Sequence, residues 1–507
     1  MSRDLNPSRK AVALERDVLT VLITIRSAMN QIAPINRLPP EILARIFEFR
    51  KGDKDLISAT HVCWRWRSAL TSTPSLWTGL ALWNPSRVFA YLTRSAALPI
   101  DVVMTTRAPA RRSHLEDFFA SPISWVDRVK SLDIGGNEEQ IKTVIQRLRF
   151  PAPLLQSLKL SGQRDRIPIW RPLSTVCFPR DFLGGQALSL RNLSFHSVSP
   201  RIPITKLPLS TLTSLTWIDE NSKVTAEDLL SLLMSTPLLE LMTIHLRVPP
   251  LLPAEKRSTV TLSRLRRLTW FNPEGGFTLT SCLIAPELQW LSLHLVSTTE
   301  YPQNGLAGIL PPNEGHFPLL IEPTKMRYIT QEGIRLYQFH SATGYINITV
   351  TTPPGHHNYP TLSWSLWNIS ISFRQIKYMT VEVGRHPLGK IPIEQLKNLE
   401  TLEVVGGGNI FFPLAQPYND TFSGAQVVPF PALLELQITP DSNTSLHLLA
   451  SVLMGRKQAG HEVETLRIRG KCRKSMVEPI GKMREFVGEL VLEPAHETSC
   501  TGHQTLS

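Results

Sequence analysis

The chain has 507 residues, of which 42% are hydrophobic and 19% are charged. This composition excludes a disordered chain and allows roughly two to four domains, or one small domain followed by a long repeat array. Lysine and arginine exceed aspartate and glutamate by 54 − 42 = 12. The charges are spread along the chain, which favours a generally basic surface over a dedicated nucleic-acid site.

The cysteines and the longest apolar run indicate the compartment. The five cysteines are far apart and odd in number, which predicts no disulfide framework and a reducing environment. The most apolar run, residues 229–246, is interrupted by Pro237 and Glu240, so we expect no membrane contact. The first residues lack a signal-peptide pattern. We therefore expect a protein of the cytoplasm, the nucleus or both.

The N-terminal segment, residues 1–33, is predicted to hold an amphipathic helix over residues 11–33. Its apolar residues recur at spacings of four, three, four, three and four. They are Leu14, Val18, Val21, Ile25, Ala28 and Ile32. The seam either packs back on the rest of the chain, which we favour, or pairs with a second helix as a coiled coil.

Residues 34–80 are predicted to form three short helices with almost no loop between them. Pro39 and Pro40 suit the first turn of a helix, where no amide donor is needed. A unit of about 45 residues can bury only a small core, and the apolar residues here exceed that capacity. The surplus indicates a partner surface or packing on the rest of the chain.

A motif in this unit resembles an F-box. It reads Leu38-Pro39-x-Glu41-Ile42-Leu43-x-x-Ile46-Phe47, then Asp55-Leu56, Val62-Cys63-x-x-Trp66-Arg67 and Leu70. The spacing matches throughout, with Trp64 and Arg50-Lys51 as departures. The resemblance implies docking onto the Skp adaptor of a cullin-RING ubiquitin ligase. The residues that it assigns to adaptor contacts or to the motif core are Leu38, Pro39, Ile42, Leu43, Ile46, Phe47, Leu56, Val62, Cys63 and Trp66.

After a further predicted helix opening at Asn84-Pro85 and a strand near Ile100, one pattern recurs: apolar-x-x-apolar-x-apolar. Most copies start 22 to 35 residues apart, a period typical of a leucine-rich-repeat solenoid with one strand per repeat. Capping residues such as Asn137 and Thr225 predict helices in some returning segments. The triplets begin at Val129, Leu155, Leu190, Leu212, Leu239, Leu265, Leu288, Ile334, Ile376, Leu399, Leu433, Val463 and Val487.

The expected fold is α+β: a small all-α F-box after an N-terminal helix, followed by an irregular leucine-rich-repeat α/β solenoid over residues 81–495. Two long gaps around Ile334 indicate an insertion or missed repeats within residues 296–375. Residues 496–507 are expected to form a flexible tail. This order of segments also resembles the large F-box family of mushroom-forming fungi, although only the first eighty residues carry specific motifs.

In such a solenoid the residues between the apolar positions face the concave surface. In the central repeats they form a stripe of small hydroxyls beside imidazole and apolar groups. We interpret the stripe as the floor of a target site, for an uncharged or phosphate-bearing segment; the alternative is ordinary solvent-facing strand residues. The candidates are Ser194, His196, Thr216, Thr243, His245, Thr269, Phe271, Ser292 and His294.

Arg467 and Arg469 are further candidates, for an acidic or phosphorylated segment, against the alternative of a solvated edge. The sequence has no phosphate-binding loop, zinc-protease motif or nucleophile elbow, so we expect neither an enzyme nor a cofactor. The favoured function is the substrate-recognition subunit of an SCF-type cullin-RING ubiquitin ligase. The alternatives are a leucine-rich-repeat scaffold acting outside a ligase and, less favoured, a nucleic-acid binder.

Overall fold

The structure is a computed structural model with two compact units. Unit 1 comprises Met1–Pro168 and Phe178–Leu190; unit 2 comprises Ile169–Cys177 and Arg191–Ser507. The residues that the structure describes are 7–49, 53–82, 85–104, 125–149, 151–162, 176–177, 179, 181–185, 188–198, 200–201, 209–219, 224–246, 259–272, 280–296, 310, 314–331, 334–351, 371, 373–383, 395–406, 414, 418–419, 426–441, 444–470 and 476–494. The predicted tail, 496–507, lies outside them.

Unit 1 begins with a long helix, α1 (Pro7–Ile32), followed by the 3-10 turn η1 (Pro34–Arg37). The apolar seam of α1 does not pack on the described part of the chain, contrary to the favoured prediction, because its large apolar side chains are exposed there. Its last turn is nevertheless held: the Asn36 side chain donates to the Asn30 carbonyl oxygen at 2.6 Å.

Three short helices follow: α2 (Pro40–Phe49), α3 (Asp53–Thr60) and α4 (Trp64–Thr71), with η2 (Pro74–Trp77) behind them. Pro40 opens α2, where its missing donor costs nothing. Leu43, Leu56, Leu70 and Trp77 are buried and form the small core. The indole of Trp77 donates to the Leu70 carbonyl oxygen at 2.8 Å, which joins η2 to α4.

A parallel sheet completes unit 1. Its strands pair in the order β1 (Gly79–Ala81), β2 (Ile100–Met104), β3 (Val129–Gly136) and β4 (Ser157–Gly162). Helix α5 (Pro85–Arg94) lies between β1 and β2 in the chain, and α7 (Glu138–Arg147) between β3 and β4. The predicted Asn137 cap is confirmed, since Asn137 and Gln140 form a reciprocal capping box.

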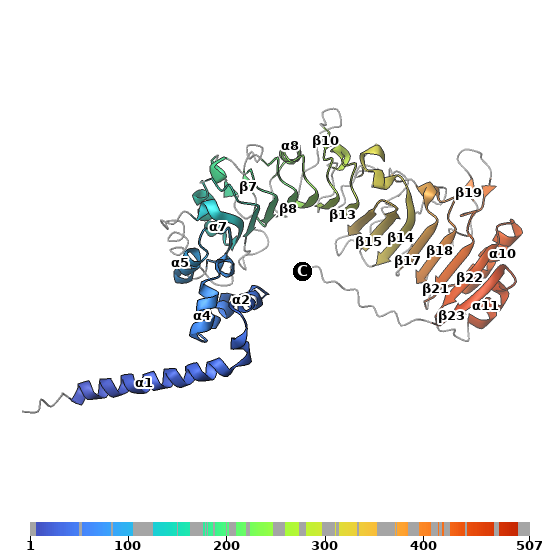
Figure 1. Cartoon of the computed structure of the whole chain (residues 1–507). Helices are drawn as coiled ribbons and strands as arrows, with labels where there is room; N and C mark the ends of the chain where they lie inside the picture. Colours follow the sequence, from blue (N-terminus) through green and yellow to red (C-terminus); the bar gives the residue numbers. More distant parts are fainter. Residues whose placement is uncertain are drawn as a thin grey trace, which may run out of the picture. The chain divides into compact units, whose positions relative to one another are not determined.

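Unit 2 is built on a large, mostly parallel sheet. The first parallel strands pair in chain order: β6 (Asn192–His196), β8 (Ser214–Asp219), β9 (Leu241–Leu246), β11 (Arg267–Asn272) and β13 (Trp290–Val296). The last are β17 (Tyr378–Val383), β18 (Thr401–Gly406), β21 (Glu435–Thr439), β22 (Val463–Arg469) and β23 (Val487–Glu493). Figure 1 shows these strands following one another through unit 2.

The segment between β13 and β17 departs from the repeat pattern. It contributes β14 (Pro323–Gln331), β15 (Ile334–Ser341) and β16 (Tyr345–Thr351) in reversed order, since β13 pairs with β16 and β14 pairs with β17. The triplet at Ile334 therefore lies in a strand, but this strand runs antiparallel to both of its neighbours. The turn before β16 passes close to the chain before β13, where a Cβ at Gly344 would overlap the Gln289 carbonyl oxygen.

Helices and short elements complete unit 2. Helix α8 (Ala226–Met234) starts at the predicted Thr225 capping box. Helix α10 (Leu446–Gln458) packs against β22 and against α11 (Val477–Met483). The short strands are β5 (Val176–Cys177), β7 (Pro200–Arg201), β10 (Val260–Thr261), β12 (Leu283–Ile284), β19 (Tyr418–Asn419) and β20 (Gln426–Val427). Further 3-10 turns in the two units are η3 (Val126–Arg128), η4 (Phe182–Gly185), η7 (Thr280–Cys282), η9 (Glu314–His316), η10 (Pro318–Leu320) and η12 (Phe373–Gln375).

The repeated triplets explain the core. The second and third apolar residues of each triplet lie in a strand, and all but Leu490 and Leu492 on β23 are buried. Because side chains alternate along a strand, the residue between them lies on the opposite face, where it is partly exposed except at Ser292 and Thr380, which are buried. That the strands belong to a leucine-rich-repeat solenoid stays a prediction.

Candidate functional site

The helices α2 to α4 present an apolar surface. Of the ten residues predicted for adaptor contact or motif core, Pro39, Ile42, Ile46 and Val62 are exposed. The others are half-buried (Leu38, Phe47, Cys63 and Trp66) or buried (Leu43 and Leu56). A small unit that keeps its own core and still exposes several aliphatic side chains offers a docking surface.

The burial separates core residues from contact residues. Leu43 is only 1% exposed, so an aspartate there would disrupt the unit itself, whereas Ile42 and Ile46 are 46% and 40% exposed and available to a partner. The half-buried Phe47 and Trp66 rings pack edge to face, 5.5 Å between centroids, and stiffen the exposed surface between them.

Sequence reasoning missed two aromatic residues beside this surface. Phe49, at the end of α2, and Trp64, at the start of α4, are strongly exposed. The guanidinium of Arg45 lies 5.8 Å from the Phe49 ring centroid. The sequence marked Trp64 only as a departure from the F-box pattern, because exposure could not be derived from a position outside the motif.

The second candidate surface is the exposed sheet face of unit 2. The structure brings the predicted hydroxyl residues together in register across five strands, each paired with the next. They are Ser194, Thr216, Thr243 and Thr269, which are partly exposed, and Ser292, which is buried. A second row lies two residues further along the same strands and contains His196, Ile218, His245, Phe271 and His294. We call these two rows the hydroxyl half.

Rings in the second row contact one another. Phe271 lies between His245, at 5.1 Å between ring centroids, and His294, at 6.2 Å. His294 Nε2 is 3.2 Å from the Ser292 hydroxyl oxygen, and burial lowers the His294 pKa from its ordinary value. Its imidazole is therefore neutral at physiological pH, which keeps this part of the face uncharged.

An aromatic row, which the sequence analysis did not identify, runs beside the hydroxyl half. It consists of Arg267, Trp290, Tyr345, His340, Lys325 and Tyr378, each in register with the next. The Trp290 and Tyr345 rings are 4.5 Å apart, and His340 is 4.7 Å from Tyr345. Arg267 and Lys325 lie over Trp290 and Tyr378 at 5.4 and 5.9 Å. The row could not be read from sequence because it crosses the strand reversal.

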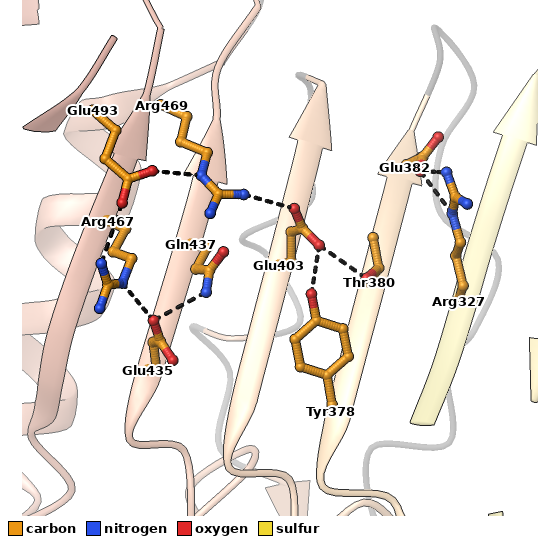
Figure 2. A network of polar contacts seen from close by, with 10 residues as sticks. All are labelled: Arg327, Tyr378, Thr380, Glu382, Glu403, Glu435, Gln437, Arg467, Arg469 and Glu493. Atoms are coloured by element: carbon orange, nitrogen blue, oxygen red, sulfur yellow. Dashed lines mark hydrogen bonds and ion pairs between the residues drawn. The ribbon is translucent and has the colours of Figure 1, made fainter. Parts of the chain in front are cut away.

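The C-terminal strands carry a polar network, which we call the ion-pair half (Figure 2). It contains Arg327, Tyr378, Thr380, Glu382, Glu403, Glu435, Gln437, Arg467, Arg469 and Glu493. Glu403 accepts from the Tyr378 hydroxyl at 2.7 Å and from Thr380 at 3.0 Å, and it pairs with Arg469 at 3.3 Å. Arg327 pairs with Glu382 on the neighbouring strand.

Arg467 and Arg469 are thus already engaged by carboxylates. Arg467 contacts Glu435 at 2.6 Å and Glu493 at 3.2 Å, and Arg469 contacts Glu493 at 2.7 Å. Hydrogen bonds from Arg469 and Arg467 lower the Glu493 pKa. Hydrogen bonds to Glu435 and then Glu493 raise the Arg467 pKa, and the hydrogen bond to Glu493 raises the Arg469 pKa. An incoming acidic segment would have to displace these carboxylates. The basic neighbours Lys471, Arg473 and Lys474 lie outside the described residues.

No group of three or more histidine, cysteine, aspartate or glutamate side chains in the described ranges is arranged to hold a metal ion. None of the helices in the described part of the chain is long and apolar enough to cross a membrane.

Comparison with known proteins identifies the helical surface. Residues 35–82 match the protein-family model described as F-box-like. A search of curated proteins finds no match to the chain. The chain therefore carries an F-box-like domain made of α2 to α4, η2 and β1. F-box domains in general bind the Skp adaptor, which indicates a substrate-adaptor role in an SCF-type complex.

Proposed function

We propose that this chain is a substrate-recognition subunit of an SCF-type cullin-RING ubiquitin ligase. The observation that carries the proposal is the exposed aliphatic surface of Ile42, Ile46 and Val62 on the F-box-like domain. In this role the chain makes no bond itself. It raises the effective concentration of a target near the charged ubiquitin carrier, and it works in the cytoplasm or nucleus without a cofactor.

The finer parts of the proposal concern unit 2. We propose that its strands form a leucine-rich-repeat-like solenoid of the kind found in the F-box family of mushroom-forming fungi, and that the hydroxyl half holds the target. The proposal is supported by a difference between the two halves in how their polar groups are paired. The ion-pair half is occupied by its own salt bridges, whereas the hydroxyl half offers small hydroxyls between two rows that contain aromatic rings. This arrangement suits an uncharged segment.

Adaptor retention tests the first part. The double variant Ile42→Asp/Ile46→Asp changes exposed residues, so we expect it to fold and to lose co-purification with the recombinant Skp adaptor. Phe89→Asp is the matched control, because Phe89 is exposed on α5, outside the F-box-like segment. If the folded double variant retains the adaptor, or if the native chain does not, the ligase proposal is wrong. A scaffold acting outside a ligase would then be the better explanation.

Target capture tests the second part. In a reconstituted ligase, Thr243→Glu/His245→Glu is expected to abolish ubiquitylation of proteins that the native chain selects, because two charges would enter an uncharged surface. Thr439→Glu, on β21 in the other half of the face, should leave selection intact. Equal selection by the native chain and by the double variant would move the target site away from the hydroxyl half.

A further inference from the structure

Helix α1 is an exposed apolar helix attached to a folded domain. Its large apolar side chains that are exposed are Val12, Leu14, Val18, Leu19, Val21, Leu22, Ile23, Ile25, Met29 and Ile32. Most of the stability of a helix in a protein comes from packing its apolar face against another surface. Something must therefore cover at least one of its faces.

The rest of the described chain does not cover the seam. Among the described elements, η1 makes the most extensive contact with α1, and it does so at the last turn. There Asn36 donates to the Asn30 carbonyl oxygen and accepts from the Trp66 indole of α4. Asn36 is buried, so this chain of bonds ties the end of α1 to the F-box-like domain while the upstream seam stays open.

The pattern of the seam identifies the kind of partner. A strict spacing of four and three residues places Val18, Ile25 and Ile32 at the a positions of a heptad, and Leu14, Val21 and Ala28 at the d positions. A sustained seven-residue repeat fits another helix that supercoils with it. In parallel coiled coils, β-branched residues at a combined with leucine at d favour two strands; all three a positions fit this rule, and Leu14 fits it among the d positions. Leu22 and Met29, at the neighbouring e positions, widen the stripe on one side.

The charges of α1 permit pairing with itself. From Pro7 to Ile32 the charged residues are Arg9, Lys10, Glu15, Arg16, Asp17 and Arg26, which sum to +2, whereas the whole chain carries a formal charge of +12. None of them occupies an a or d position. Two copies of α1 can therefore approach along the seam, because the charged side chains lie outside it and the net charge of the helix is small.

We propose that α1 pairs in parallel with α1 of a second copy of this chain, which makes the protein a dimer through a two-stranded coiled coil. The bonds through Asn36 then hold two F-box-like domains at the same end of the coiled coil. If the proposed ligase role holds, one assembly presents two adaptors to one target, which raises their effective concentration. The dimer itself does not depend on that role.

Light scattering of the full chain tests the dimer, with two variants of the same residue type. Ile25 lies in the seam and is 55% exposed; Ile23 lies on the opposite side of the helix and is 63% exposed. We expect the native chain and Ile23→Asp to have twice the 57.0 kDa mass of one chain, and Ile25→Asp to have the mass of one chain. Both variants are equally harmless to a single chain, so folding does not confound the result.

Three outcomes would overturn the proposal. A native chain of single mass would mean that α1 is covered by its own chain or by another protein. A native mass three times that of one chain would indicate a three-stranded coiled coil in place of the pair. If Ile23→Asp lowered the mass as much as Ile25→Asp, the dimer contact would not follow the seam.

Cross-linking tests the parallel orientation. Ala28→Cys at a d position should form a disulfide-linked dimer on mild oxidation, whereas Ile23→Cys and the native chain should not. In an antiparallel pair the two copies of residue 28 would lie roughly 15 Å or more apart, too far for a disulfide. Failure of Ala28→Cys to cross-link in a chain of double mass would therefore exclude the parallel arrangement.

Discussion

The hydroxyl half and the ion-pair half of unit 2 share a strand pattern and differ in what the exposed positions carry. Both halves bury the same triplet positions, such as Leu268 on β11 and Leu436 on β21. The residue that follows each of these leucines lies on the opposite face of the sheet. It is Thr269 on β11, and on β21 it is Gln437, which donates to Glu435. The fold is set by the inward residues, and the outward residues are free to differ.

The difference separates a surface whose charged groups pair with one another from a surface made mainly of hydroxyl groups and rings. In the ion-pair half, carboxylates, guanidinium groups and the Tyr378 hydroxyl bind one another across β14, β17, β18, β21, β22 and β23 (Figure 2). In the hydroxyl half, rings and small hydroxyls lie in register and present groups that a partner can contact without breaking a salt bridge. The charged cluster of the ion-pair half is therefore better explained as a structural network, and the uncharged hydroxyl half is the better candidate for target recognition.

The largest expected effect concerns what the two halves share. Leu268→Ala and Leu436→Ala each remove a fully buried side chain, so each should lower the free energy of unfolding by about 2–5 kcal/mol. The measurement is urea unfolding, with hydrogen exchange to assign the loss to the strands around each site. A large loss at one site and none at the other would show that the two halves are not built on equivalent cores.

A smaller effect should distinguish the halves on the exposed face. Glu403→Ala removes the acceptor of Tyr378 and Thr380 and a partner of Arg469, and should lower the free energy of unfolding by about 1–3 kcal/mol. Thr269→Ala in the hydroxyl half should change it by less than about 0.5 kcal/mol. The same unfolding assay compares the two variants. Glu403→Gln keeps one acceptor oxygen, so its loss of unfolding free energy should lie between those of the two alanine variants. Equal losses for the two alanine variants would contradict the distinction.

Much of the fold could be predicted from sequence because the inward positions are periodic. The triplet starting at Leu265 places Leu268 and Trp270 in the core of β11, and Thr225 marks the start of α8 by its capping box. The strand reversal could not be predicted in this way. The triplet at Ile334 satisfies the same pattern in an antiparallel strand, because alternation along a strand does not encode its direction.

The candidate surfaces were predictable to a different degree. The hydroxyl row follows from the register of parallel strands, so Thr243 and Thr269 lie side by side. The partners of Arg467 and Arg469 were not predictable, because Glu403 and Glu493 approach them from distant parts of the sequence. The exposure of α1 was wrongly anticipated, since a heptad seam fits a second helix as well as its own chain.

The smallest expected effect depends on pH and separates the halves again. Burial lowers the His294 pKa below its ordinary value of 6.5, and its in-register neighbours Phe271 and Thr349 carry no charge. The unfolded chain therefore binds this proton more tightly, and the free energy of unfolding should fall as pH drops below about 6.5. In the ion-pair half, arginine contacts lower the Glu493 pKa, so its contribution persists until pH falls below its ordinary value of 4.5.

Thermal unfolding should thus show a lower stability at pH 5.5 than at pH 7.0. This loss of stability should be smaller in His294→Gln and unchanged in Glu493→Gln. A loss on acidification that is unchanged in His294→Gln would assign it to another group, and the hydroxyl half would then be as indifferent to mild acid as the ion-pair half.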